Sequence, residues 1–258
     1  MWQQAKELYF YREMLKNLVS KDLRSRYKGS ILGFFWTFLN PLFMLIVYNL
    51  VFSYIMRIQM ENFTMFLFVG LLSWSFISTS IIMGTSSLVD NGALLKKIYF
   101  PRVVLPLSIV ITNLINYLLS LVILIPALLF FGVDLTLAVI ALPVLLLVKA
   151  MFVASLVFLV AIANVFFRDL QHIVGIITMA WFFLTPVLYP IEQVPPQLRV
   201  FIYLNPATHI IESFRDIFFH GRWPQWIALG YLTLGLILLL VFSLYIFNHL
   251  QKSVAEEI

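Results

Sequence analysis

Side chains that could carry acid–base, nucleophilic or metal chemistry are few in this chain and stand far apart. His172 and His249 are isolated, and His209 and His220 would lie roughly 16 Å apart on one helix, too far to share a metal ion. No carboxylate falls deep inside a long apolar segment, so paired-acid catalysis and a carboxylate proton relay lack residues. The chain has no cysteine and no glycine-rich phosphate loop ending in Gly-Lys-Ser or Gly-Lys-Thr. We therefore predict no catalytic residue, metal site or cofactor on this chain.

Lys149 is the one charge that falls about midway along an apolar run. A lysine at the bilayer centre costs about 2.5–3.5 kcal/mol on insertion scales, so we do not expect it to face lipid. No acid lies deep enough to be its obvious partner. Four readings stay open: a hydrated path that attracts an anion, a neutral buried lysine, hydrogen bonds to backbone carbonyls at a neighbouring kink, and snorkelling to an interface.

The elements that would position these residues are apolar almost throughout. Apolar residues make up 62% of the chain, charged residues 11%, and the mean hydropathy is +0.98. Runs of 18 or more apolar residues are typical of membrane-spanning helices. Six such runs occur, at roughly 31–56, 63–88, 103–131, 135–163, 173–190 and 226–247. We predict an all-α polytopic membrane protein with six transmembrane helices, forming one domain over residues 1–258.

The distribution of Lys and Arg predicts the orientation. With six spans both termini share a side, and that side carries 12 of the 17 Lys and Arg residues, against four on the other. By the positive-inside rule both termini are cytoplasmic. The pI of 9.4 reflects this bias, and no basic groove with interleaved aromatic residues indicates nucleic-acid binding. We expect a multi-pass protein of the cytoplasmic membrane.

Two segments on the cytoplasmic side have apolar faces. Residues 1–29 repeat apolar residues at helical spacing opposite a polar face, which predicts an amphipathic interface helix that either anchors the chain or docks a partner. In the loop 90–102, Asp90 or Asn91 can cap a short helix that Pro101 cannot continue. Its apolar residues would be exposed to the cytosol unless a partner covered them, so we favour docking over a plain connector.

The external segment 185–224 also departs from a simple loop. Asn205-Pro206 reads as an N-cap followed by proline at the first helical position, and the helix would run to about Phe219, with Gly221 after it. A helix of this length is too short to cross the bilayer. A pair of short helices that enter the membrane from the external side without crossing it fits the sequence better than a spanning helix. Such helices must be covered by protein or line a water-filled cavity. They form either a lid on an exit path or an interfacial cap.

Four motifs in order resemble those of one family across essentially the whole chain. They are Arg26-Tyr27-Lys28-Gly29-Ser30-Ile31-Leu32-Gly33 with Trp36 and Asn40-Pro41; Asn91 through Leu105-Pro106, with Lys96 and Phe100-Pro101-Arg102; Asn164-Val165-Phe166-Phe167-Arg168-Asp169; and Thr185-Pro186 and Tyr189 with Leu204-Asn205-Pro206 and Arg215. The chain resembles the transmembrane subunits of ABC-2 type exporters, in particular the O-antigen, capsule and wall teichoic acid permeases. Lys149 maps onto none of these motifs.

The resemblance implies a homodimeric, non-enzymatic transport subunit. It implies that two copies of a separate ATPase bind ATP and Mg²⁺, and that the substrate is a glycan on an undecaprenyl pyrophosphate carrier. Two alternatives remain: an ABC-2 permease for another lipid or a drug, and a membrane-embedded glycosyl- or phosphotransferase, whose acid clusters the sequence lacks.

The resemblance also suggests three groups of site residues. The ATPase-coupling candidates in the loop are Asn91, Leu94, Leu95, Lys96, Ile98, Phe100 and Arg102. The substrate-path candidates chosen by position are Trp36, Tyr48, Trp181, Phe182 and Phe183, and Lys149 joins them as an intramembrane charge, independently of the resemblance. The external-gate candidates are Pro186, Asn205, Pro206, His209, Glu212 and Arg215.

Overall fold

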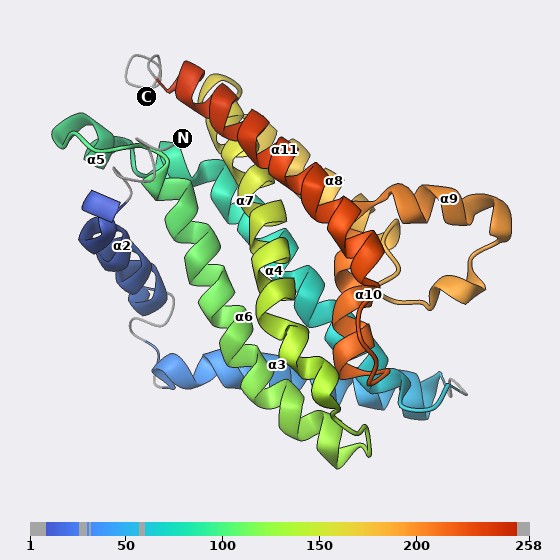
Figure 1. The fold of residues 1–258 in the computed structure, drawn as a ribbon. Helices are drawn as coiled ribbons and strands as arrows, with labels where there is room; N and C mark the ends of the chain where they lie inside the picture. Colours follow the sequence, from blue (N-terminus) through green and yellow to red (C-terminus); the bar gives the residue numbers. More distant parts are fainter. Residues whose placement is uncertain (1–8, 26–29, 31, 57–59, 252–258) are drawn as a thin grey trace.

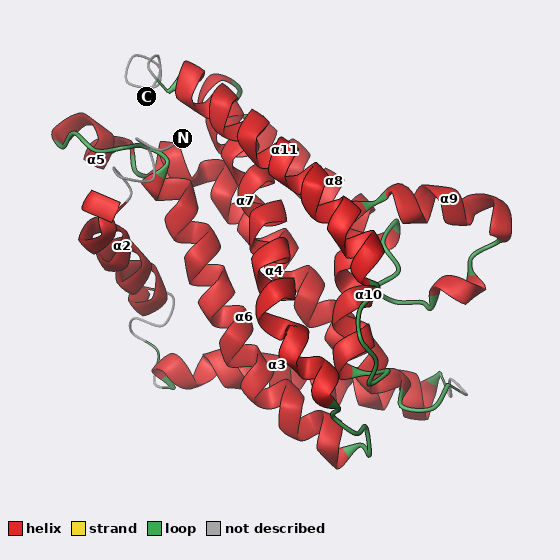
Figure 2. Cartoon of the chain, in the orientation of Figure 1, coloured by secondary structure: helices red, strands yellow, loops and turns green. Residues whose placement is uncertain are grey.

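The computed structural model describes residues 9–25, 30, 32–56 and 60–251, and the regular structure within these ranges is helical throughout (Figures 1 and 2). The α-helices are α2 (Arg12–Ser25), α3 (Trp36–Tyr48), α4 (Phe63–Asp90), α5 (Gly92–Lys97), α6 (Val104–Phe130), α7 (Leu142–Phe166), α8 (Leu170–Phe183), α9 (Pro196–Leu204), α10 (Pro206–Phe218) and α11 (Trp226–Leu250). A π-helix, Asn49–Ile55, continues α3, and short 3-10 segments lie at Gly33–Phe35, Leu137–Ala141 and Ile191–Gln193.

The described part of the chain contains five helical segments that are long and apolar enough to cross a membrane. They are Trp36–Ser53, Phe63–Asp90, Val104–Phe130, Leu137–Phe166 and Trp226–Leu250. These segments confirm the predicted all-α polytopic class.

The fifth predicted span is shorter than its apolar run. Helix α8 has 14 residues, which is about 21 Å of rise against roughly 30 Å of hydrocarbon. The run continues to residue 190, but the helix ends at Phe183. Pro186 lacks a backbone N–H and disfavours helical geometry at Thr185, so the remaining apolar residues form a turn. Apolar composition alone therefore overestimated the helical length here.

Helix α4 lies at the centre of the bundle because it is apolar on nearly all sides. It packs against α6, α7, α8 and α10. A glycine allows its close approach to α7, since a Cβ added at Gly84 would lie 2.5 Å from Val157 Cγ1. Small residues at such crossings are typical of helix packing in membranes.

Helices α3 and α11 are the least covered of the long helices. Figure 1 shows α3 crossing α6 obliquely, and a cavity of about 450 Å³ lies where Leu42 and Ile46 meet Pro126 and Phe130. Large apolar side chains on the outer faces of both helices are exposed, for example Phe43 and Ile227. In a bilayer these faces contact lipid or another protein.

The predicted amphipathic helix corresponds in part to α2. Leu18 and Val19 are buried, and the helix packs against α6. Positions 1–8 and 26–29 of the predicted segment fall outside the described residues, as does part of the first motif. Helix α5 and the C-terminal end of α11 lie at the same end of the bundle (Figure 1).

Candidate functional site

Asn205 joins the two predicted gate elements to α8. Its Oδ1 accepts a hydrogen bond of 3.0 Å from the backbone N–H of Ala207, which confirms the predicted N-cap of α10. The same oxygen accepts a 3.0 Å bond from Trp181 Nε1 of α8. Asn205 Nδ2 donates to Thr185 Oγ1 at 2.9 Å, and Thr185 Oγ1 donates to the Trp181 carbonyl at 2.8 Å. One amide therefore fixes the start of α10 against the end of α8.

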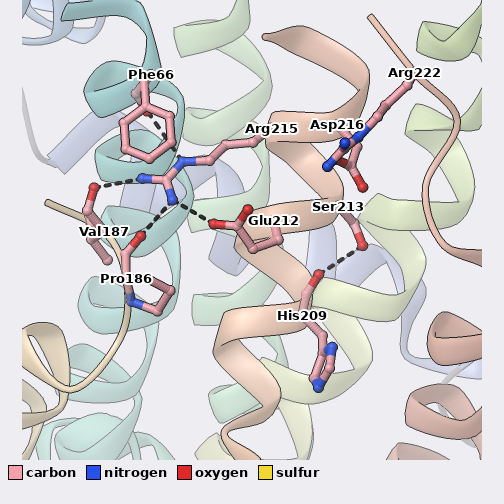
Figure 3. Close-up of polar contacts among 9 residues, drawn as sticks. All are labelled: Phe66, Pro186, Val187, His209, Glu212, Ser213, Arg215, Asp216 and Arg222. Carbon is pink, nitrogen blue, oxygen red and sulfur yellow. Dashed lines mark hydrogen bonds and ion pairs between the residues drawn. The ribbon is translucent and has the colours of Figure 1, made fainter. Parts of the chain in front are cut away.

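Arg215 is a fully buried cation on α10 (Figure 3). Its Nη1 donates to the Pro186 carbonyl at 2.5 Å and to Glu212 Oε1 at 2.6 Å, and its Nη2 donates to the Val187 carbonyl at 2.6 Å. The guanidinium carbon lies 3.5 Å from the centroid of the Phe66 ring of α4. Arg215 thus connects the turn after α8, helix α10 and the bundle centre, and a buried charge needs such partners.

A glycine of α4 makes room for this guanidinium. A Cβ added at Gly70 would lie 2.7 Å from Arg215 Nη2. Arg215 belongs to one of the sequence motifs, but nothing in the sequence indicated that Gly70 and Phe66 contact its guanidinium. The contact becomes visible only when residues about 145 positions apart are brought together.

Helix α10 has the two faces that the sequence predicted. Ile210, Phe214, Ile217 and Phe218 are buried in the bundle. The opposite face borders a cavity of about 140 Å³, whose polar lining includes His209, Glu192, Glu212, Ser213 and Asp216.

Local polar contacts hold α9 against α10 and the end of α10 against the segment that follows it. His209 Nε2 shares a 2.7 Å hydrogen bond with the Tyr203 carbonyl of α9, and Asp216 pairs with Arg222 at 2.7 Å. Burial lowers the pKa of His220 from its ordinary value, and the nearby Arg222 lowers it further. Gly221 follows with a φ of +62°, a conformation that glycine adopts readily.

The predicted coupling loop borders a cavity of about 680 Å³. Leu95, Lys96, Ile98, Phe100 and Arg102 line it as part of the segment 95–103. Tyr11, Asn248 and Gln251 complete the lining from the two ends of the chain.

The predicted short helix of this loop is present, but no side-chain hydrogen bond caps it. Helix α5 spans six residues, Gly92–Lys97. Asn91 occupies the N-cap position without a side-chain cap bond, and its Nδ2 donates instead to the Ser87 carbonyl at 2.9 Å. Asn91 and Leu94 are not among the residues that line the cavity, whereas Tyr99, which sequence reasoning missed, is 94% exposed at its edge.

The aromatic substrate-path candidates separate into two groups. Trp181 and Phe182 of α8 contact Trp74 of α4, with ring centroids 5.7 and 5.8 Å apart, and Phe183 contacts Phe182 at 5.1 Å. On α3, Trp36 Nε1 donates to Ser30 Oγ at 3.0 Å, and the Tyr48 and Phe52 ring centroids are 6.2 Å apart. The structure places the α8 aromatic residues against α4 at the bundle centre, and Tyr48 of α3 packs at the edge of the same buried core.

Lys149 lies in an aromatic cage. Its Nζ is 3.4 Å from the ring centroid of Tyr117, 4.3 Å from that of Phe214 and 5.1 Å from that of Phe76. The residue is fully buried, and Nζ has no hydrogen-bond partner among the residues that the structure describes. Snorkelling and carbonyl hydrogen bonds are therefore wrong in this conformation. Three helices, α4, α6 and α10, supply the rings, and cation–π attraction to them is available to the protonated amine in place of an acid partner.

These features define a polytopic helical membrane protein with a lined cavity at one end of its bundle and short packed helices after α8. The chain belongs to the ABC-2 type transporter family, whose sequence profile matches residues 13–219. This membership confirms the resemblance drawn from the four motifs. The family is one of membrane-embedded transporters that work with an ATPase partner.

Curated relatives extend over nearly the whole chain. It is 41% identical to the O-antigen export system permease protein RfbA of Myxococcus xanthus, over 98% of each chain. It is 34% identical to the protein of the same name from Klebsiella pneumoniae, over 95% of this chain and 94% of that one. The polysialic acid transport protein KpsM of Escherichia coli is 22% identical, over 92% of this chain and 93% of the other.

Proposed function

We propose that this chain is the transmembrane subunit of an ATP-driven exporter that moves a cell-surface glycan, of O-antigen or wall teichoic acid type, across the cytoplasmic membrane. Two full-length relatives carry the name of O-antigen export permeases, which favours the O-antigen type. The substrate is linked to undecaprenyl pyrophosphate. The chain itself is not an enzyme.

The observation that carries the proposal is the cavity of about 680 Å³ bordered by the coupling loop. Ile98 and Tyr99 at this cavity are 53% and 94% exposed, and Lys96 and Arg102 add positive charge. Large apolar side chains exposed beside a polar-lined cavity are typical of a docking surface. We assign this surface to a cytoplasmic ATPase, which binds ATP and Mg²⁺.

The working assembly is a homodimer of this chain with two ATPase copies. The outer apolar faces of α3 and α11 are available for pairing, and closed two-fold dimers are the commonest oligomers. Both termini are cytoplasmic, since α2, α5 and the C-terminal end of α11 lie near the docking cavity, where basic residues concentrate. Helices α9 and α10 then form the external gate.

Deletion of the permease gene in its host tests the function. We expect the lipid-linked glycan to accumulate on the cytoplasmic leaflet and the surface glycan to disappear. Expression of this chain together with its ATPase restores the surface glycan, and expression of either alone does not. Surface glycan that persists in the deletion strain would contradict the proposal.

A further inference from the structure

A polar cleft lies between the middles of α4 and α6. Its volume is about 90 Å³, and its polar lining consists of Ser75, Thr79, Asn113, Asn116, Tyr117 and Ser120. Both helices are long apolar spans, and the cleft lies about 18 Å from their ends. Polar groups at this depth do not face lipid, so in the membrane the cleft is covered by protein or meets water or a polar ligand.

Asn116, which lines the cleft, has side-chain polar atoms without hydrogen-bond partners in the described part of the chain. Its side-chain Nδ2 and Oδ1 are both buried, and neither has a hydrogen-bond partner among the described residues. A buried amide without partners is costly, so native structures normally satisfy it. An amide both donates and accepts, which matches water or the hydroxyl groups of a sugar.

The cleft also shares two aromatic rings with the Lys149 cage. Phe76 and Tyr117 line the cleft, and the same rings lie 5.1 and 3.4 Å from Lys149 Nζ. The Lys149 side chain is fully buried, so these rings separate its amino group from the cleft. None of the residues that line the cleft is acidic. When Lys149 is protonated, its charge in this poorly screened interior acts on the cleft across one ring thickness.

We propose that the cleft between α4 and α6 is a contact site for a phosphorylated sugar group of the substrate. Thr79 and Asn116 exchange hydrogen bonds with sugar hydroxyls, and Lys149 attracts the phosphate electrostatically. The inference rests on the proposed glycan export and assigns that substrate to particular side chains. A phosphorylated polyol could also come from a bilayer lipid headgroup, and the experiment separates the two sources.

The test uses the permease–ATPase complex in phosphatidylcholine proteoliposomes. The probes are an undecaprenyl pyrophosphate-linked oligosaccharide, the same oligosaccharide on neutral diacylglycerol, and phosphatidylglycerol. The readout is the probe concentration that gives half-maximal stimulation of ATP hydrolysis. Asn116→Leu and Thr79→Val each raise this concentration roughly three- to tenfold for both glycolipids, because each removes one hydrogen bond.

Lys149 variants isolate the contribution of charge. Lys149→Met raises the half-maximal concentration for the pyrophosphate-linked probe only, and Lys149→Arg, which keeps the charge, restores most of the affinity. Thr233→Val on α11 is the matched control, since the Thr233 hydroxyl donates to the Leu229 carbonyl of its own helix at 2.7 Å. We expect this control to match the wild type with every probe.

Two results would overturn the site while leaving glycan export intact. One is wild-type half-maximal concentrations in both Asn116→Leu and Thr79→Val. The other is stimulation by phosphatidylglycerol that the cleft variants weaken as much as they weaken stimulation by the glycolipids. A wild-type complex that neither glycolipid stimulates would instead overturn the proposed function, and this inference with it.

Discussion

Trp181 Nε1 donates a 3.0 Å hydrogen bond to Asn205 Oδ1, the same oxygen that caps the first turn of α10. The aromatic end of α8 and the start of the gate helix therefore share one acceptor. Trp181 also contacts Trp74 of α4 and Phe152 of α7. A movement of α8 relative to the bundle would strain this hydrogen bond, and the strain would act directly on the first turn of α10.

Asn205→Ala tests this joint. We expect a loss of about 1–2 kcal/mol in the free energy of unfolding, because the variant removes the N-cap and the Trp181 contact together. Asn205→Asp keeps an acceptor for both N–H groups and should lose less. Thermal unfolding of the purified permease in detergent measures both, and equal losses for the two variants would contradict the shared-acceptor explanation.

Arg215→Met should destabilise the permease by about 3–5 kcal/mol, because it leaves two buried carbonyls and Glu212 without their cationic partner. Arg168→Met is the matched control. Arg168 is exposed, so its loss should stay within about 0.5 kcal/mol. The same unfolding assay compares them. Similar stability for both variants would mean that the buried guanidinium contributes little.

Negative charges on the coupling loop should separate the ATPase from the permease. Leu94→Asp, Leu95→Asp and Ile98→Asp combined replace three apolar side chains of this loop by carboxylates, and burying unpaired charge against a partner is strongly unfavourable. Affinity purification of the membrane-inserted permease should then recover little ATPase. Phe167→Asp, at an exposed residue of the α7–α8 loop, is the control and should retain it. A fully assembled triple variant with stimulated turnover would make the loop a connector only.

Cysteine labelling should distinguish the two gate helices. Ile217 is fully buried on α10, whereas Phe201 on α9 is 69% exposed. A membrane-impermeant thiol reagent should label Phe201→Cys at rest and leave Ile217→Cys unlabelled until ATP is added with the ATPase bound. The chain has no cysteine of its own to interfere. Labelling of Ile217→Cys that is independent of ATP would count against a moving gate.

Local sequence signals predicted much of this architecture. Asn205-Pro206 has the residue types that an N-cap and a first helical position require, and the helix begins there. The apolar face of α10 also followed from its spacing. The end of α8 was missed because Pro186 interrupts an apolar run whose composition does not change.

The Lys149 cage depended on tertiary contacts. Phe76, Tyr117 and Phe214 are separated along the chain and belong to three helices, so no spacing rule relates them. The sequence identified Lys149 as an unpaired charge, but the partners considered for it were an anion in a hydrated path, backbone carbonyls or the membrane interface. Aromatic side chains are so common among apolar spans that a cage of rings has no distinctive pattern.

The most direct test of the account is ATP-dependent movement of an undecaprenyl pyrophosphate-linked O-antigen glycan across proteoliposomes. We predict transport only when this permease and its ATPase are reconstituted together, with no ATP hydrolysis by the permease alone. Transport that needs no ATPase, ATP hydrolysis by the isolated permease, or a stimulated complex that leaves the glycan on its original leaflet would contradict the account.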